Sequence, residues 1–256
     1  MVFQNTAFYD LFNTSKPVLA MIHLKGDSRE EMLKIAKHEI DLLIENEIDA
    51  VIIENYFGSI EDMEEVLKYV YKERKNIIYG INVLDDDKKA FELAMKYDAK
   101  FIQIDSVAGH LTVEEDKKFH EFINQMRAQT NVLVFGGVRF KYQPYLSGRS
   151  LEEDLTIAMS RCDGIVVTGS GTGMETDLEK IREFRTLIGN QFPLIVGAGL
   201  TAENCGSQLS IADGAIVGSY LKDSYKDTGD VCAAHVKNFM KEILKIRGKA
   251  IAEKSN

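Results

Sequence analysis

The sequence predicts a closed barrel of eight parallel strands and eight crossover helices, the (β/α)₈ or TIM-barrel class of α/β folds. Eight short runs of apolar and β-branched residues recur along the chain, and each is typical of a buried strand. From Val18 to Gly214 these runs start about 28 residues apart on average, the length of one strand plus one crossover helix. An open doubly wound sheet is the alternative, but such sheets more often have about five or six strands.

The predicted strands and helices alternate along the whole chain, as parallel βα units require. The strands are expected at Val18–Ile22, Ala50–Ile53, Ile77–Ile81, Phe101–Ile104, Val132–Phe135, Gly164–Val167, Leu194–Val196 and Gly214–Val217. Apolar residues at helical spacing predict helices around Arg29–Asn46, Met63–Val70, Phe91–Met95, Phe119–Met126, Leu178–Ile188 and Val236–Ile246. Ser59, Thr112, Ser150 and Thr201 precede acidic residues as helix N-caps do, so each is expected to begin a helix.

The chain is predicted to form one domain, residues 1–256. Only three prolines occur, and no stretch rich in Pro, Gly or Ser interrupts the pattern. Residues 1–17 are expected to be an N-terminal cap segment. Within it, Thr6–Phe12 carries Phe8, Leu11 and Phe12 at helical spacing, which predicts a short helix packed under the N-terminal end of the barrel.

Composition excludes several classes of function. The net charge of −9 has the wrong sign for binding a nucleic-acid backbone. Three widely spaced cysteines provide neither a disulfide framework nor a CxxC metal site. No apolar run approaches the ~18 residues of a membrane span, and no signal peptide can be read. We therefore expect a cytoplasmic protein with a small-molecule ligand, and homo-oligomerisation is left open.

Polar residues end the predicted strands, at the end of the barrel where TIM-barrel enzymes bind their substrates. Along the fourth strand, Gln103 and Asp105 alternate with isoleucines that must face the helices, so both side chains are expected inside the barrel. Burying a carboxylate there without a partner would cost several kcal/mol, so Asp105 needs a cation or a ligand. Lys141 is the nearest candidate cation in chain order. The candidate catalytic residues are Asp105, Lys141, Asn82, Glu54 and His23.

Each of these residues also has a purely structural interpretation. Asp105 could cap the following loop, Lys141 could be a loop charge like Arg139, and His23 could be a satisfied core histidine. Asn82 could be a turn residue, because Asn tolerates left-handed backbone geometry. Glu54, Asp105 and His23 are of metal-ligand type, so Mg²⁺ is possible, but no metal site or other cofactor is predicted.

Glycine-rich loops follow the last three strands and predict a phosphate site. Backbone amides free of side chains bind anions, and barrels commonly hold a phosphate on the loops after strands seven and eight. A third cluster, Thr168–Gly173, is interpreted as a mobile loop that closes over the ligand. The predicted phosphate-binding residues are Gly171, Gly199, Gly218 and Ser219. The alternative is that these glycines only allow close packing of strand against helix. Nucleotide cofactors are not implied, since no GxGxxG follows the first strand and no Walker A lysine occurs.

An ordered series of segments resembles the BtpA/SgcQ family from Val18 to the loop after the eighth strand. The segments are Met21–Lys25, Glu54–Tyr56, Asn82–Leu84, Thr168–Gly169, Val196–Asn204 and Ala212–Ser219. The resemblance implies a barrel of the ribulose-phosphate-binding type. One photosynthetic member of the family is associated with photosystem I biogenesis, and others look like accessory enzymes of sugar operons.

Three functions are therefore weighed. The first is an enzyme with acid–base chemistry of isomerase or lyase type, acting on a small phosphorylated sugar or sugar-nucleoside. The second is a noncatalytic accessory or biogenesis factor. The third is a nucleosidase or nucleotide hydrolase, which would prefer adenine-containing ligands.

Overall fold

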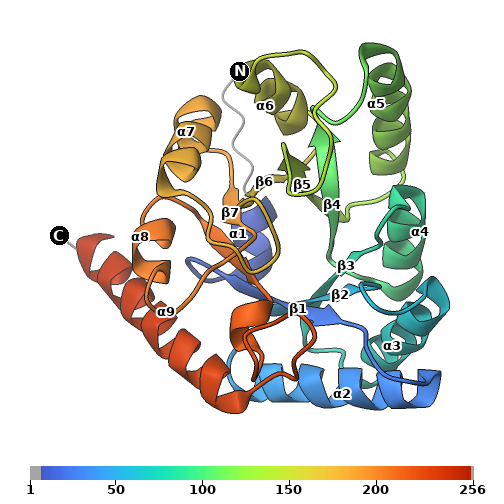
Figure 1. Cartoon of the computed structure of the whole chain (residues 1–256), viewed down its shortest axis with the longest axis vertical. Helices are drawn as coiled ribbons and strands as arrows, with labels where there is room; N and C mark the ends of the chain where they lie inside the picture. Colours follow the sequence, from blue (N-terminus) through green and yellow to red (C-terminus); the bar gives the residue numbers. More distant parts are fainter. Residues whose placement is uncertain (1–6, 255–256) are drawn as a thin grey trace.

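The computed structural model describes residues 7–254, with side chains described as far as residue 248. In it, eight parallel strands form a closed barrel in the order β1 to β8, and helices surround it (Figure 1). Every strand pairs with the next one in the sequence, and β8 pairs with β1. The predicted (β/α)₈ fold is confirmed, and the open-sheet alternative is wrong.

All eight predicted apolar runs form strands. They are β1 (Val18–His23), β2 (Ala50–Glu54), β3 (Ile78–Asn82), β4 (Phe101–Ala108), β5 (Leu133–Val138), β6 (Gly164–Val167), β7 (Leu194–Val196) and β8 (Gly214–Val217). β4 is longer than predicted, and its pairing with β5 contains an irregularity between Ile104 and Ala108. We term this irregularity the β4 bulge.

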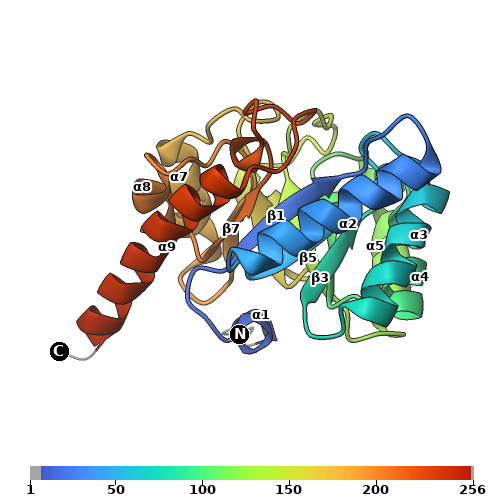
Figure 2. The same ribbon diagram turned by 90° about the horizontal axis from the view of Figure 1, so that it is seen from below.

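The helices are α1 (Ala7–Phe12), α2 (Arg29–Glu45), α3 (Ile60–Glu73), α4 (Asp87–Tyr97), α5 (Val113–Arg127), α6 (Leu151–Met159), α7 (Leu178–Ile188), α8 (Cys205–Leu209), the 3₁₀ turn η1 (Ser219–Leu221) and α9 (Ala233–Lys254). The far end of α9 extends past the barrel (Figure 2). Among the helices of residues 7–254, none is both long and apolar enough to cross a membrane.

Three of the four predicted helix starts are confirmed. Ser59, Thr112 and Ser150 are N-caps, each in a capping box with the acidic residue three positions later. The prediction for Thr201 is wrong, because α8 begins at Cys205 and its N-cap is Asn204. The Thr201 hydroxyl instead accepts hydrogen bonds from the N–H groups of Glu203 and Asn204, at 3.2 and 3.3 Å. These bonds form a turn that precedes the helix.

The short helix α1 closes one end of the barrel, as predicted (Figure 2). Phe8 and Phe12 are buried, and their rings pack against those of Phe101 and Phe135 inside the barrel. These aromatics belong to the core within the barrel, and a separate apolar core lies between the strands and the helices. The first residues of the predicted cap segment, 1–6, lie outside the described residues. With its N-terminal end closed, the barrel is left with polar side chains at the opposite end.

Candidate functional site

A row of hydrogen-bonded polar side chains crosses the inside of the barrel mouth from β1 to β4. His23 Nε2 lies 3.3 Å from Glu54 Oε2. Asn82 Nδ2 donates to Glu54 Oε1 at 2.8 Å and to Asp105 Oδ1 at 3.2 Å, and Gln103 Nε2 donates to the same Asp105 oxygen at 3.4 Å. We term these five residues the polar row.

Strand register explains the polar row. His23 pairs with Glu54, and Glu54 pairs with Asn82, across the neighbouring strands. Residues in register on adjacent strands point to the same face, so the side chains meet inside the barrel. The predictions that Asp105 points inward and reaches Asn82 are confirmed.

Lys141 is not the hydrogen-bonding partner of Asp105. Its Nζ donates to Thr172 Oγ1 at 3.2 Å, in the loop after β6. β5 ends at Val138, so Lys141 lies in the loop above the strand and faces the next loop. Its charge still lowers the pKa of the Asp105 carboxyl, although burial outweighs this effect and the pKa is raised. Asp105 therefore gets its contacts from amides and not from a cation.

Burial sets the protonation state of the His23–Glu54 pair. Desolvation, aided by the charge of Asp105, raises the pKa of Glu54 to about 8. Desolvation, aided by the charge of Lys222, lowers the pKa of His23 to about 4. His23 Nδ1 lies 3.4 Å from the main-chain oxygen of Asp227. We infer that at neutral pH Glu54 keeps its proton and donates it to His23 Nε2, while Nδ1–H faces Asp227.

These pKa shifts predict opposite effects on stability. Glu54 has a raised pKa in the folded state, so its contribution is present below about pH 4.5 and is lost as the pH rises to about 8. His23 has a lowered pKa, so stability through it rises between about pH 4 and 6.5. Up to about pH 6.5 the effects of His23 and Glu54 on the free energy of unfolding have opposite signs. Above that pH only Glu54 still changes the stability, which falls.

Between pH 6.5 and 8 the wild type should therefore lose about 2 kcal/mol of its free energy of unfolding as Glu54 ionises. The Glu54→Gln variant should not show this loss. The Gln amide can donate to His23 as the protonated carboxyl does, but it cannot ionise. Urea denaturation at both pH values measures the difference. The exposed Glu92→Gln variant is the control and should follow the wild type. Parallel stability curves for Glu54→Gln and the wild type would contradict the assigned proton.

A cavity of about 280 Å³ opens where β7, β8 and β1 end, and we term it the glycine-loop cavity. His23 and Lys141 line it, together with Gly199, Gly218 and Ser219 from the loops after β7 and β8. Among the described residues, none accepts a hydrogen bond from the main-chain N–H of these last three. The cavity thus combines unpaired amide donors with a lysine and one end of the polar row.

Gly171 differs from the other predicted phosphate residues because it does not line this cavity. Its neighbours Thr172 and Gly173 do, while Gly171 lies against the side chains of Tyr142 and Met174. Gly199 has a left-handed φ of +66°, and a Cβ there would collide with the backbone at Met174. The close-packing interpretation therefore also holds for Gly199, alongside its place in the cavity wall.

A second cavity of about 160 Å³ lies at the other end of the polar row, above β3 and β4, and we term it the acidic cavity. Its polar lining residues are Asn82, Asp85, Asp87, Asp105, Ser106, His110 and Gln143. Sequence reasoning missed Asp85, Asp87, Ser106, His110 and Gln143. The acidic run Asp85–Asp87, which follows β3 after Val83 and Leu84, indicates the first two.

Comparison with known proteins places the chain in a family. The sequence model of the BtpA family matches residues 14–245. The chain belongs to the BtpA family. The photosystem I biogenesis protein BtpA of Synechocystis is 26% identical over 239 residues, which cover 84% of this chain and 83% of that protein. An uncharacterised protein of Methanocaldococcus jannaschii is 27% identical over 241 residues, covering 84% and 90%.

Solved structures agree on the fold of this BtpA-family chain. The 3-hexulose-6-phosphate synthase of Salmonella typhimurium superposes with a TM-score of 0.63 at 12% identity, covering 90% of this chain and 99% of that one. At this identity the similarity concerns the fold alone. It agrees with the closed (β/α)₈ barrel described above.

The residues first considered for Mg²⁺ do not form a shared site in this BtpA-family barrel. Glu54 and His23 contact each other, and Asn82 stands between Glu54 and Asp105. Within residues 7–254, no group of three or more His, Cys, Asp or Glu residues is arranged to hold a metal ion.

The loop after β8 covers His23 and is held by charge pairs. The buried Lys222 Nζ donates to Glu39 Oε1 at 3.0 Å, and Val231 N–H donates to the same oxygen at 3.1 Å. Lys25 Nζ bonds Asp230 at 2.6 Å from the loop after β1. The segment between Lys222 and Val231 is thus fixed at both of its ends, and it delivers the carbonyl that faces His23.

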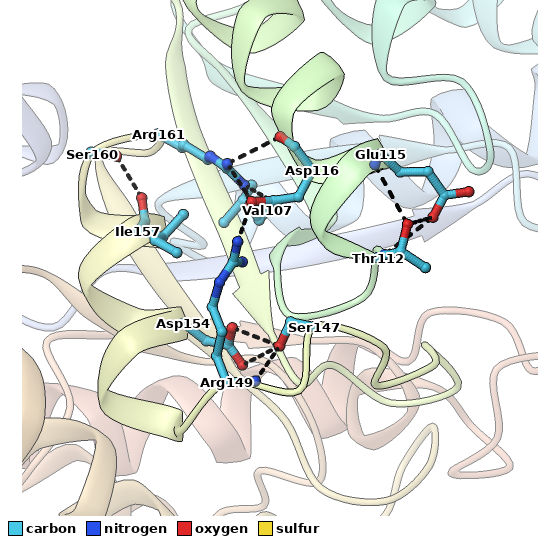
Figure 3. A network of polar contacts seen from close by, with 10 residues as sticks. All are labelled: Val107, Thr112, Glu115, Asp116, Ser147, Arg149, Asp154, Ile157, Ser160 and Arg161. Carbon is cyan, nitrogen blue, oxygen red and sulfur yellow. Dashed lines mark hydrogen bonds and ion pairs between the residues drawn. The ribbon is translucent and has the colours of Figure 1, made fainter.

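A buried network outside the barrel holds the far end of the loop after β5, the same loop in which Lys141 lies. Arg161 Nη1 donates to Val107 O and to Asp116 Oδ1, both at 2.7 Å. Arg149 Nη2 donates to Asp116 Oδ2 at 3.0 Å (Figure 3). Arg149 ends the loop that begins after β5, so the network connects this loop to β4 and α5.

Arg161→Met should lower the free energy of unfolding by about 3 kcal/mol, because it leaves a buried carboxylate with one partner fewer. Arg161 is 2% exposed and Asp116 is 4% exposed. Urea denaturation measures the loss. The control is Arg182→Met, which removes an exposed pair with Glu179 and should change stability by less than about 1 kcal/mol. Equal effects of the two substitutions would show that the network does not stabilise the fold.

Proposed function

We propose that this BtpA-family barrel is an enzyme that acts on a small phosphorylated sugar by acid–base chemistry of isomerase or lyase type. The observation that carries the proposal is the glycine-loop cavity. Unpaired amides of Gly199, Gly218 and Ser219 share this cavity with Lys141 and His23, and His23 begins the polar row. Unpaired N–H donors and titratable side chains thus lie side by side.

The two ends of the substrate would make different contacts. The phosphate would accept hydrogen bonds from the unpaired amides, which a low-dielectric cavity makes strong. Lys141 would polarise a carbonyl or hydroxyl oxygen of the sugar. The Asp105 carboxylate would exchange a proton with the sugar. The cavity volume of about 280 Å³ fits a small ligand, since sites for larger molecules reach about 1,000 Å³.

The proton states of the polar row suit this role. Glu54 and His23 share one proton without a net charge at neutral pH, because burial raises one pKa and lowers the other. Such a pair can release or take up a proton next to the reacting group. Asp105 has a raised pKa from burial, which makes it a stronger base than an exposed aspartate.

A noncatalytic assembly factor is the second candidate, because the Synechocystis relative is named a photosystem I biogenesis protein. Against it stands the cost of burying the polar row. Burying polar and titratable groups costs free energy that an apolar interior would not. A protein with no reaction to catalyse has less reason to keep them.

Thermal stabilisation by a panel of phosphosugars, their unphosphorylated sugars, nucleotides and divalent metals tests the proposal. A ligand present at about 100 times its Kd stabilises the folded state by about 2.7 kcal/mol, which gives a clear rise in melting temperature. We expect phosphosugars to stabilise and the free sugars to have no effect, followed by turnover of a stabilising compound. Preference for adenine nucleotides would indicate a nucleotide hydrolase, and no stabilising ligand at all would favour the assembly factor.

A further inference from the structure

The acidic cavity holds three carboxylates that have no basic partner. Asp85, Asp87 and Asp105 take part in none of the ion pairs among the described residues. Asp87 and Asp105 are half-buried, whereas Asp85 is exposed at the rim. The buried carboxylates Asp116 and Asp163, by contrast, each pair with an arginine. The wall of this cavity therefore combines two half-buried carboxylates and one exposed carboxylate, and none of them forms an ion pair with the lysines and arginines of the described residues.

A buried hydroxyl lies in the same wall. Ser106 is 4% exposed and lines the cavity, and no described residue forms a hydrogen bond with its Oγ. The β4 bulge places the adjacent residues Asp105 and Ser106 on one wall, which regular alternation would forbid. An unsatisfied buried polar group costs about 1–3 kcal/mol, so a wall built this way suits a polar ligand.

We propose that the acidic cavity is a subsite for a primary ammonium group carried by the ligand. An ammonium group has one positive charge and three donors, which match the unpaired carboxylates and the Ser106 hydroxyl. The volume of about 160 Å³ suits this compact group. This deepens the proposed function by giving the phosphosugar an amino group, and to that extent it rests on that function.

Two other occupants fit the cavity less well. A directly bound metal needs several ligands close together, and the described residues hold no such group of three or more His, Cys, Asp or Glu side chains. An ammonium group needs less, because one carboxylate can offset its charge while its other N–H donors bond separate acceptors. A neutral hydroxyl would leave the half-buried carboxyls of Asp87 and Asp105 without a counter-charge when they ionise. Consistent with this, burial and the neighbouring carboxylates Asp105, Asp86 and Asp85 raise the pKa of Asp87 to about 7, and a bound cation would relieve that repulsion.

The test uses methylammonium chloride, with tetramethylammonium chloride and magnesium chloride as comparison salts at equal ionic strength. Tetramethylammonium has the charge but no N–H donor. Melting temperatures are measured for the wild type, Asp87→Asn and Asp98→Asn. Asp98 is the matched control, because it caps the opposite end of the same helix α4. We expect methylammonium to stabilise the wild type and Asp98→Asn, and the shift to be lost in Asp87→Asn.

Equal shifts with methylammonium and tetramethylammonium, or a shift that survives in Asp87→Asn, would overturn the inference. Stabilisation by Mg²⁺ that depends on Asp87 would also overturn it, since the occupant would then be a metal ion. None of these salts contains phosphate. A failure of the proposed function would therefore be seen separately, as absent stabilisation by phosphosugars. A phosphosugar with an amino group should bind about tenfold tighter than its hydroxyl counterpart, and only while Asp87 is present.

Discussion

Asp105→Asn should lower turnover of the phosphosugar substrate by at least about 100-fold and keep the melting temperature within a few degrees. Asn retains an oxygen that can accept the hydrogen bonds of Asn82 and Gln103, so the polar row can persist. It loses the basic carboxylate that would exchange a proton with the sugar. The loss therefore belongs to the reaction and not to folding.

Turnover and calorimetric melting of Asp105→Asn are compared with those of Asp98→Asn, the same substitution at the far end of α4. The control should keep full activity. A large loss of stability in Asp105→Asn, with ligand binding at the glycine-loop cavity intact, would contradict the catalytic role. In that case Asp105 would be a structural residue.

Gly218→Asp should weaken the binding of inorganic phosphate at least tenfold, because it adds a carboxylate beside the unpaired amides. Gly218 has an ordinary φ of −121°. A Cβ there would lie 3.3 Å from the His23 ring and 3.5 Å from Met21, a tight fit that small shifts can relieve. Gly199 cannot serve for this experiment, since its left-handed φ excludes most side chains.

Gly218→Asn is the matched neutral variant, with nearly the same size and shape. Calorimetric titration with phosphate should show a much smaller loss for Asn than for Asp. Equal losses would mean that the side chain acts by bulk alone. If the wild type does not bind phosphate, the predicted phosphate site is wrong.

The fold could be predicted because parallel βα units repeat at a regular period, and that period is visible in runs such as Val18–Ile22 and Gly164–Val167. The polar row could be predicted because residues alternate between the two faces of a strand. Alternation places Gln103 and Asp105 inside the barrel, and the structure confirms that Asp105 reaches Asn82.

Features that depend on irregular backbone could not be predicted. Ser106 enters the acidic cavity through the β4 bulge, which breaks the alternation that sequence reasoning assumes. Lys141 faces Thr172 because the loop after β5 bends toward the next loop, and no periodic pattern describes a loop. The contact between His23 and Asp227 joins residues at opposite ends of the sequence, so only the closed barrel brings them together.

A crystal structure of the protein soaked in inorganic phosphate tests most directly whether the barrel mouth holds a phosphorylated ligand. We expect one tetrahedral anion in the glycine-loop cavity, within hydrogen-bonding distance of the main-chain N–H groups of Gly199, Gly218 and Ser219. Amides already bonded to protein groups, with no room for the anion, would contradict the phosphate site and the function proposed from it.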